Sequence, residues 1–163
     1  MSDIYTQSWY ESLKEILNRS DQVTKSAPRG LWHVLAEIRG DGVSPYIPQA
    51  EQKRFAIVLN DGKCNSYEEL AEAPPRKDFE FILQIPASLF ERIVANMADP
   101  VEAGLKGAIK ITGDMRVLIQ NAELVNVLSE IYQREVETEW PKGKPPYAGE
   151  PLAAPPRAAG AAS

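Results

Sequence analysis

The sequence has one cysteine, Cys64, and one histidine, His33, among its 163 residues. A single cysteine excludes an internal disulfide bond and a cysteine-based metal cluster. A single histidine leaves few bases for nucleophilic catalysis, which needs a serine or cysteine next to a base. The sequence also contains no Gly-x-Ser-x-Gly motif and no glycine-rich phosphate loop. We therefore expect no enzymatic activity, no catalytic residue, no metal site and no cofactor.

Long apolar runs and an excess of positive charge are also missing. No apolar run approaches the roughly 18 residues of a membrane-spanning helix. The net charge of −5 argues against a broad nucleic-acid surface, and Lys142 and Lys144 are too few for a membrane-binding patch. The first residues have no basic stretch followed by an apolar one, so we expect no secretory signal. We expect a cytoplasmic protein with no nucleic-acid partner and no stable membrane anchor.

The length fits one folded domain with a tail. Prolines recur after Trp140 in a segment that is otherwise rich in alanine and glycine. Such a segment has too few apolar side chains to fold alone. We therefore predict a domain over residues 1–140 and a Pro/Ala-rich C-terminal tail over residues 141–163.

Periodicity and turn signals predict helices and strands in the first half of the chain. Ser8 and Glu11 have capping-box spacing, so we predict that a helix begins near Ser8. Alternating apolar residues and turn signals assign a strand over 31–39, a long loop over 40–53, a strand over 54–59 and a hairpin turn at Asn60-Asp61-Gly62-Lys63. Residues 64–73 fit either an edge strand or a short helix with Ser66 and Glu69 as its capping pair.

The second half alternates strands with apolar helices. The same signals assign a strand over 79–85, a helix capped by Ser88 and Glu91, a short helical turn after Asp99-Pro100, a strand over 108–112, a tight turn at Gly113 and a helix capped by Asp114. That last helix, over residues 115–137, carries two apolar stripes where a helix on a sheet needs one. The second stripe needs a ligand, another helix or another subunit as its partner. Alternatively, a break near Asn121 gives two short core helices.

Four features over residues 79–128 resemble one known family. They are the strand over 79–85, the helix over 89–97, the Asp99-Pro100 step and the run Leu105-Lys106-Gly107-Ala108-Ile109-Lys110-Ile111-Thr112-Gly113-Asp114. Together they resemble the sterol carrier protein type-2 family of lipid-binding domains. The resemblance implies an α+β fold, with a five-stranded, mainly antiparallel sheet covered on one face by helices. It also implies an apolar tunnel between sheet and helices that accepts acyl chains, sterols or isoprenoids.

The apolar faces of two predicted helices supply the candidate ligand-binding residues of this tunnel. They are Phe90, Ile93, Val94 and Met97 in the first, and Met115, Leu118, Ile119, Ala122 and Val125 in the second. Methionine suits an irregular apolar site because its thioether chain is flexible. We predict a non-catalytic intracellular carrier that presents or sequesters an acyl, sterol or isoprenoid ligand.

Two alternative functions stay open at this point. One is an accessory module that binds a partner or dimerises beside a lipid-metabolising enzyme, in which protein covers the second apolar stripe. The other is an enzyme that acts on an acyl substrate through His33 or Cys64.

Overall fold

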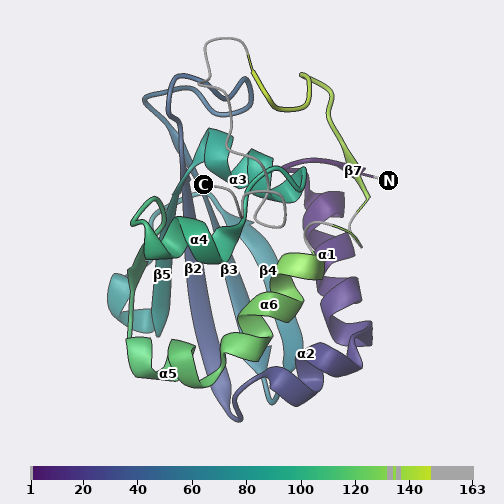
Figure 1. Cartoon of the computed structure of the whole chain (residues 1–163), viewed down its shortest axis with the longest axis vertical. Coiled ribbons are helices and arrows are strands. Elements are labelled where there is room, and N and C mark those ends of the chain that lie inside the picture. The colour runs from purple at the N-terminus through teal and green to yellow at the C-terminus, as the bar shows by residue number, and fades with distance from the viewer. Residues whose placement is uncertain (1, 132–133, 135–136, 148–163) are drawn as a thin grey trace, which may run out of the picture.

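A five-stranded sheet forms the centre of the protein (Figure 1). The structure is a computed structural model and describes residues 2–131, 134 and 137–147, without the side chains of helical residues 101, 118, 122, 125 and 129. The strands lie in the order β4-β3-β2-β5-β6, with the bounds β2 Leu31–Arg39, β3 Gln52–Asn60, β4 Lys63–Leu70, β5 Phe81–Pro86 and β6 Lys110–Thr112. Among these neighbours, β2 and β5 run parallel and the other pairs run antiparallel. The predicted five-stranded, mainly antiparallel sheet is confirmed.

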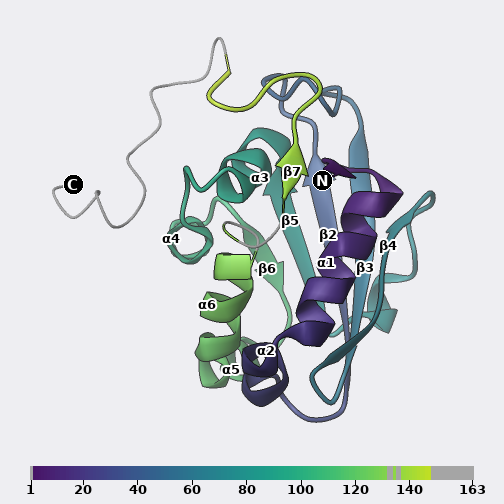
Figure 2. The ribbon, with the colours of Figure 1, turned by 90° about the vertical axis from the view of Figure 1, so that its right-hand side faces the viewer.

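The α-helices of the described chain cover one face of this sheet (Figure 2). Their bounds are α1 Gln7–Arg19, α2 Asp21–Ser26, α3 Ala87–Val94, α4 Pro100–Leu105, α5 Met115–Gln120 and α6 Ala122–Glu130. The connection between β4 and β5, which contains the 3₁₀-helix Arg76–Asp78, crosses the opposite face (Figure 2). None of the helices in the described residues has the length and apolar character needed to cross a membrane. The predicted α+β architecture with helices on one face is also confirmed.

The central strand β2 is buried on both faces. Ala36 faces the helices, whereas Leu35 and Glu37 face the crossing connection, because successive side chains of a strand alternate. The buried Glu37 carboxylate accepts hydrogen bonds from Gln84 Nε2 at 2.9 Å and from Arg76 Nη1 at 3.1 Å. Arg76 belongs to the crossing connection, so this ion pair holds the connection against the back of the sheet.

The hairpin between β3 and β4 has the predicted turn. Asp61 and Gly62 adopt φ values of 48° and 84°, as the primed hairpin turns require. Beyond the turn, β4 pairs antiparallel with β3 and forms an edge of the sheet, so the edge-strand alternative is confirmed and the short helix is wrong. A register shift in this pair puts both Cys64 and Tyr67 on the buried face despite their odd spacing.

Two predicted helix caps are wrong. Helix α1 begins at Gln7, one residue before Ser8, and its cap is Thr6, whose hydroxyl accepts from the Trp9 N–H. Helix α3 begins at Ala87 after Pro86, without a side-chain cap. Ser88 and Glu91 lie inside α3 and are buried. The Ser88 hydroxyl donates to Asp41, and Glu91 accepts from Tyr147, so both side chains bind tertiary partners.

The predicted helix over residues 115–137 is broken at Asn121 into α5 and α6, so the predicted break is confirmed. The description of both pieces as core helices is wrong for α5, because Met115 and Ile119 are exposed. The Asn121 backbone lies outside helical values, with φ −115° and ψ 33°, and its Nδ2 donates to the Val117 carbonyl at 2.8 Å. Asparagine side chains bind nearby backbone in this way and compete with continued helix.

The predicted strand ends differ from the observed ones by small shifts. Strand β3 begins two residues before the predicted strand over 54–59, while β5 and β6 begin two residues after the strands predicted from 79 and 108. A second, two-stranded sheet joins the N-terminal segment to residues near position 140. Strand β1 (Ser2–Asp3) pairs parallel with β7 (Thr138–Glu139), which places the N-terminus beside residues 138–139 (Figure 2).

Candidate functional site

An apolar layer lies between the sheet and the helices. Helices α1, α3 and α6 contribute most of its helical side. The described buried side chains are Trp9, Tyr10, Leu13 and Leu17 from α1, Leu89, Phe90, Ile93 and Val94 from α3, and Leu124 and Val127 from α6, with Ile131 following it. The sheet contributes Ala36, Ile38, Phe55, Leu59 and Ile85. This layer is where the fold concentrates apolar surface, and it is therefore the candidate site for a greasy ligand.

The layer differs between its two halves. Near α1, the Phe90 ring lies 5.9 Å from the ring of Tyr5, 6.2 Å from Trp9 and 5.9 Å from Phe55, measured between ring centroids. These rings fill the space between α1, α3 and β3 (tilted and edge-on contacts are favourable for aromatic pairs). The described buried side chains of α6 and of the residue after it, Leu124, Val127 and Ile131, are aliphatic. Helix α1 packs closely on β4, whereas α6 makes its main contacts with α2 and α4.

The predicted ligand-binding residues take different positions. Phe90, Ile93 and Val94 are buried in the apolar layer, and Met97 is half-buried just beyond the end of α3. In α5, Met115 and Ile119 are exposed on the outside of the protein. The side chains of the other three predicted residues, Leu118, Ala122 and Val125, lie outside the described part of the structure.

Two hollows on the described residues lie away from the apolar layer. One, of about 380 Å³, is beside Glu15, Asn18 and Arg19 on the outside of α1. The other, of about 260 Å³, lies under residues 46–48 at the ends of β3 and β4 and is mainly polar. Neither has the apolar lining that a lipid chain needs.

Helix α3 also carries a buried carboxylate, that of Glu91. Glu91 is 0% exposed and accepts three hydrogen bonds from hydroxyl groups. Tyr5 donates at 2.6 Å, Ser44 at 2.7 Å and Tyr147 at 2.7 Å. The donors come from the N-terminal segment, the loop between β2 and β3 and the C-terminal segment, so Glu91 joins three distant parts of the chain to α3.

The electrostatics of this cluster follow from burial and hydrogen bonding. Burial raises the pKa of Glu91, and the bonds from Tyr5, Tyr147 and Ser44 offset this only in part. At neighbouring Asp41, burial also opposes ionisation, but hydrogen bonds from Ser88 and from backbone amides outweigh it and lower the pKa of that carboxyl. Asp41 therefore holds the loop between β2 and β3 to the start of α3 as an ionised group.

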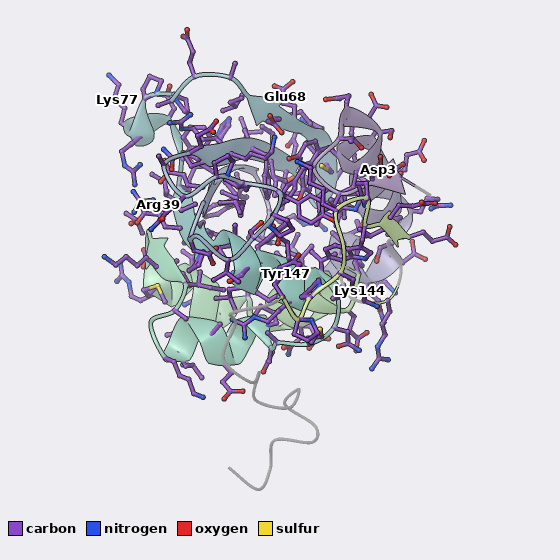
Figure 3. All side chains as sticks on the ribbon, turned by 90° about the horizontal axis from the view of Figure 1, so that it is seen from above. Asp3, Arg39, Glu68, Lys77, Lys144 and Tyr147 are labelled. Carbon is purple, nitrogen blue, oxygen red and sulfur yellow. The ribbon has the colours of Figure 1, made fainter. Side chains whose placement is uncertain are left out.

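The C-terminal strap, which we define as residues 138–147, lies over this end of the protein (Figure 3). Trp9 Nε1 donates to the Thr138 hydroxyl at 3.0 Å, and the Tyr46 hydroxyl donates to the Gly143 carbonyl at 2.8 Å. Trp140 packs edge-on against the Tyr46 ring at 6.2 Å. The first seven residues of the predicted tail thus lie against the domain, and residues 148–163 are outside the described range.

Replacing Tyr147 with phenylalanine should loosen the C-terminal strap. The change removes one hydrogen bond to Glu91 and keeps the ring, so we expect a loss of about 1 kcal/mol in local stability. Hydrogen exchange should show faster amide exchange over residues 141–147. The matched control is Tyr10→Phe, which removes a tyrosine–glutamate bond between α1 and β4. Equal exchange of the strap in both variants would contradict the assignment.

Cys64 and His33, the two residues considered as a nucleophile or base, have different surroundings. Burial raises the pKa of the Cys64 thiol to about 11, and its Sγ donates to the Ser66 carbonyl. The His33 ring is partly exposed at the back of the sheet, 3.2 Å from a Glu80 oxygen. Within the residues that the structure describes, no three histidine, cysteine, aspartate or glutamate side chains gather where they could hold a metal ion.

The Glu91 cluster has only one signal in the sequence. Glu91 lies four residues after Ala87 and three before Val94, and both of these are buried. A carboxylate with apolar neighbours at these helical spacings indicates a buried acid, but its spacing from Ser88 also fits a capping box. The tyrosine and serine donors lie 47–86 residues away in the chain, so local patterns cannot predict them.

The mixed sheet, the helices on one face and the apolar layer between them define a sterol-carrier-type α+β domain. A crystal structure of sterol carrier protein 2 superimposes with a TM-score of 0.68 at 17% identity, over 83% of this chain and 100% of the other. A conserved hypothetical protein of Thermus thermophilus, whose description suggests a sterol carrier protein, also has a TM-score of 0.68 at 17% identity, over 86% of this chain and 94% of its own. The sequence matches none of the functionally curated proteins.

The family follows from the sequence itself. The model of the SCP-2 sterol transfer family matches residues 35–126, which is more than half of the chain. The protein therefore belongs to the SCP-2 sterol transfer family, and lipid binding or transfer is the function that this family implies. The resemblance noted from residues 79–128 is confirmed.

Proposed function

We propose that the protein is a non-catalytic carrier that binds one acyl, sterol or isoprenoid lipid between the sheet and the helices. The observation that supports this most is the position of the apolar layer, which lies on the helical face and draws its strand residues and its α3 residues from the region matched by the family. The lipid would enter the aliphatic half of the layer, bounded by α3 and α6, because aromatic rings fill the half under α1.

We expect helix α6 to move when the lipid enters. Its described buried side chains are Leu124 and Val127, and its main contacts are with α2 and α4 and not with a strand. An outward shift of α6 would open an apolar tunnel without breaking the sheet or the aromatic packing. The short helix α5, joined to α6 at Asn121, would move with it.

The energetics favour a lipid with a long apolar chain. Removing a methylene group from water contributes roughly 0.8 kcal/mol, so a sixteen-carbon chain gains on the order of 12 kcal/mol before the costs of ordering it. The carrier needs apolar contact and no reactive group. The protonated Cys64 and the outward His33 agree with a role in which the lipid leaves chemically unchanged.

Native mass spectrometry of the freshly purified protein tests the proposal directly. We expect a population heavier than the chain by the mass of one lipid, which organic extraction releases and identifies. A fluorescent fatty-acid probe should bind and be displaced by the extracted lipid. A protein that carries no lipid and binds neither the probe nor a sterol or isoprenoid would contradict the proposal.

A variant that blocks the proposed cavity tests where the lipid binds. Met97→Trp introduces a larger side chain at the end of α3, where Met97 is half-buried. We expect at least about a tenfold loss of probe affinity, with less than about 1 kcal/mol lost in the free energy of unfolding, because the ring takes the place of ligand. The control is Leu31→Trp, at an exposed position on the back of the sheet. A plain core would instead lose about 1–3 kcal/mol of stability and keep its probe affinity.

A further inference from the structure

Large apolar side chains are exposed in one short stretch of the chain. Leu105 is 83% exposed, Ile119 is 72% exposed and Met115 is 47% exposed. The other exposed large apolar residue among those described, Leu31 at 52%, lies at the start of β2. Its side chain points to the back of the sheet because Trp32, the next residue, packs on the helical side.

The helices that carry these three residues, α4 and α5, lie on the same side of the protein (Figure 2). Leu105 ends α4, and the chain then runs along one edge of the molecule through β6 to α5, which carries Met115 and Ile119 (Figure 1). Strand β6 is the edge strand of the sheet. Met115 and Ile119 are four residues apart in α5 and share one helical face. We call the exposed surface formed by Leu105, Met115, Ile119 and the cations between them the α4–α5 patch.

The charge of the α4–α5 patch is opposite to that of the whole protein. Residues 102–119 contain three cations, Lys106, Lys110 and Arg116, and two carboxylates, Glu102 and Asp114, whereas the chain has a net charge of −5. Two of the cations make ion pairs at the surface, Lys106 with Glu102 and Arg116 with Asp114. Solvent-exposed pairs are weak, so these cations can exchange a carboxylate for a lipid phosphate at little cost.

We propose that the α4–α5 patch docks the protein transiently on an anionic lipid bilayer. Exposed apolar side chains flanked by lysine and arginine are the composition of surfaces that insert shallowly into the headgroup region. The anionic remainder of the protein is repelled by the same bilayer, which orients the patch toward the lipid and keeps the attachment reversible. The inference rests on the proposed function, because a carrier must meet a membrane to take up or deliver its lipid.

A second copy of the chain fits this patch less well. In a two-fold dimer the patch would face itself, which would bring the three cations of each copy together. An anionic bilayer instead supplies the opposite charge over the whole surface. The position of the α4–α5 patch also suits lipid uptake from a bilayer. Helix α5 is joined directly to α6, the helix that we expect to move when the lipid enters.

Co-sedimentation with vesicles tests the docking surface. We expect the wild-type protein to bind vesicles of equal parts phosphatidylcholine and phosphatidylglycerol more strongly than vesicles of phosphatidylcholine alone. Ile119→Glu and Leu105→Glu should each lower the binding to the anionic vesicles by about tenfold or more, through lost apolar burial and added repulsion. Lys110→Ala should lower it by about fivefold. Leu31→Glu makes the same change at the back of the sheet and should leave binding unchanged.

The outcomes separate docking from lipid carriage. Absent vesicle binding, equal binding to neutral and anionic vesicles, or equal binding by Ile119→Glu and Leu31→Glu would overturn the docking proposal. A wild-type dimer that Ile119→Glu converts to a monomer, without vesicle binding, would assign the patch to a second copy. Probe binding measured without vesicles tests the proposed function separately, since these exposed substitutions leave the apolar layer intact. Circular dichroism checks that each variant is folded.

Discussion

Replacing Glu91 with alanine should lower the free energy of unfolding by about 3–5 kcal/mol. The substitution leaves the hydroxyls of Tyr5, Ser44 and Tyr147 without their acceptor and creates a void in a position that is 0% exposed. It also releases both terminal segments from α3. Urea unfolding measures the effect, and hydrogen exchange should show early loss of protection at residues 2–6 and 138–147. A loss below about 1 kcal/mol would show that the cluster contributes little.

Glu91→Gln is the matched control and carries its own pH dependence. Glutamine keeps an acceptor oxygen, so we expect a much smaller loss than with alanine. Because burial raises the pKa of Glu91, its contribution to stability is fully present below the ordinary value of 4.5 and is lost as the pH rises through the folded-state value. The difference in unfolding free energy between wild type and Glu91→Gln should therefore favour wild type more at about pH 4 than at about pH 7. A difference that grows with pH would contradict the direction of this shift.

Replacing Gly113 with valine should cost at least about 3 kcal/mol or prevent folding. Gly113 has φ +149°, and a Cβ atom there would overlap the Phe81 ring and lie 2.6 Å from the Glu80 carbonyl oxygen. The clash arises because β6 pairs with β5 directly before this turn, which brings the two backbones together. Phe81 cannot move aside easily, since its ring stacks on Trp32.

Gly107→Ala is the control for Gly113. Gly107 also has a positive φ, +80°, but a Cβ atom there meets nothing within 4 Å. It should therefore cost only the backbone strain of about 1–2 kcal/mol. Thermal or urea unfolding of both variants separates strain from steric contact, and equal losses would show that the approach of Gly113 to Phe81 is not limiting.

Local patterns predicted the elements of this fold well where a segment is held by its own neighbours. The alternation in residues 31–39 matches β2, and Asp61-Gly62 forms the expected turn. Such features depend on the two-residue period of a strand and on which residues tolerate positive φ, so the sequence contains them completely.

Patterns failed where a polar residue had a choice of partner. Ser88 and Glu91 have the spacing of a capping box, yet Ser88 binds Asp41 and Glu91 binds three hydroxyls from other segments. At Asn121 the sequence allowed both a continuous helix and a break, and the structure has the break. A side chain near a helix end selects the partner that tertiary packing supplies, and that partner is invisible locally.

The sequence patterns predicted which apolar residues of the candidate site share a helical face, but not which way each face points. The apolar spacing of Phe90, Ile93 and Val94 showed that they share a helical face, and that face is buried. The spacing of Met115 and Ile119 showed a shared face equally well, but it did not show that this face points outward.

The sequence by itself determined most strands and helices to within about two residues, which side chains share a face, and the family to which the chain belongs. Only the tertiary structure decided which apolar face turns inward, where the terminal segments attach and which carboxylate is buried. Faces and turns follow from backbone geometry over a few residues, whereas orientation and partner choice depend on contacts between segments that are far apart in the chain.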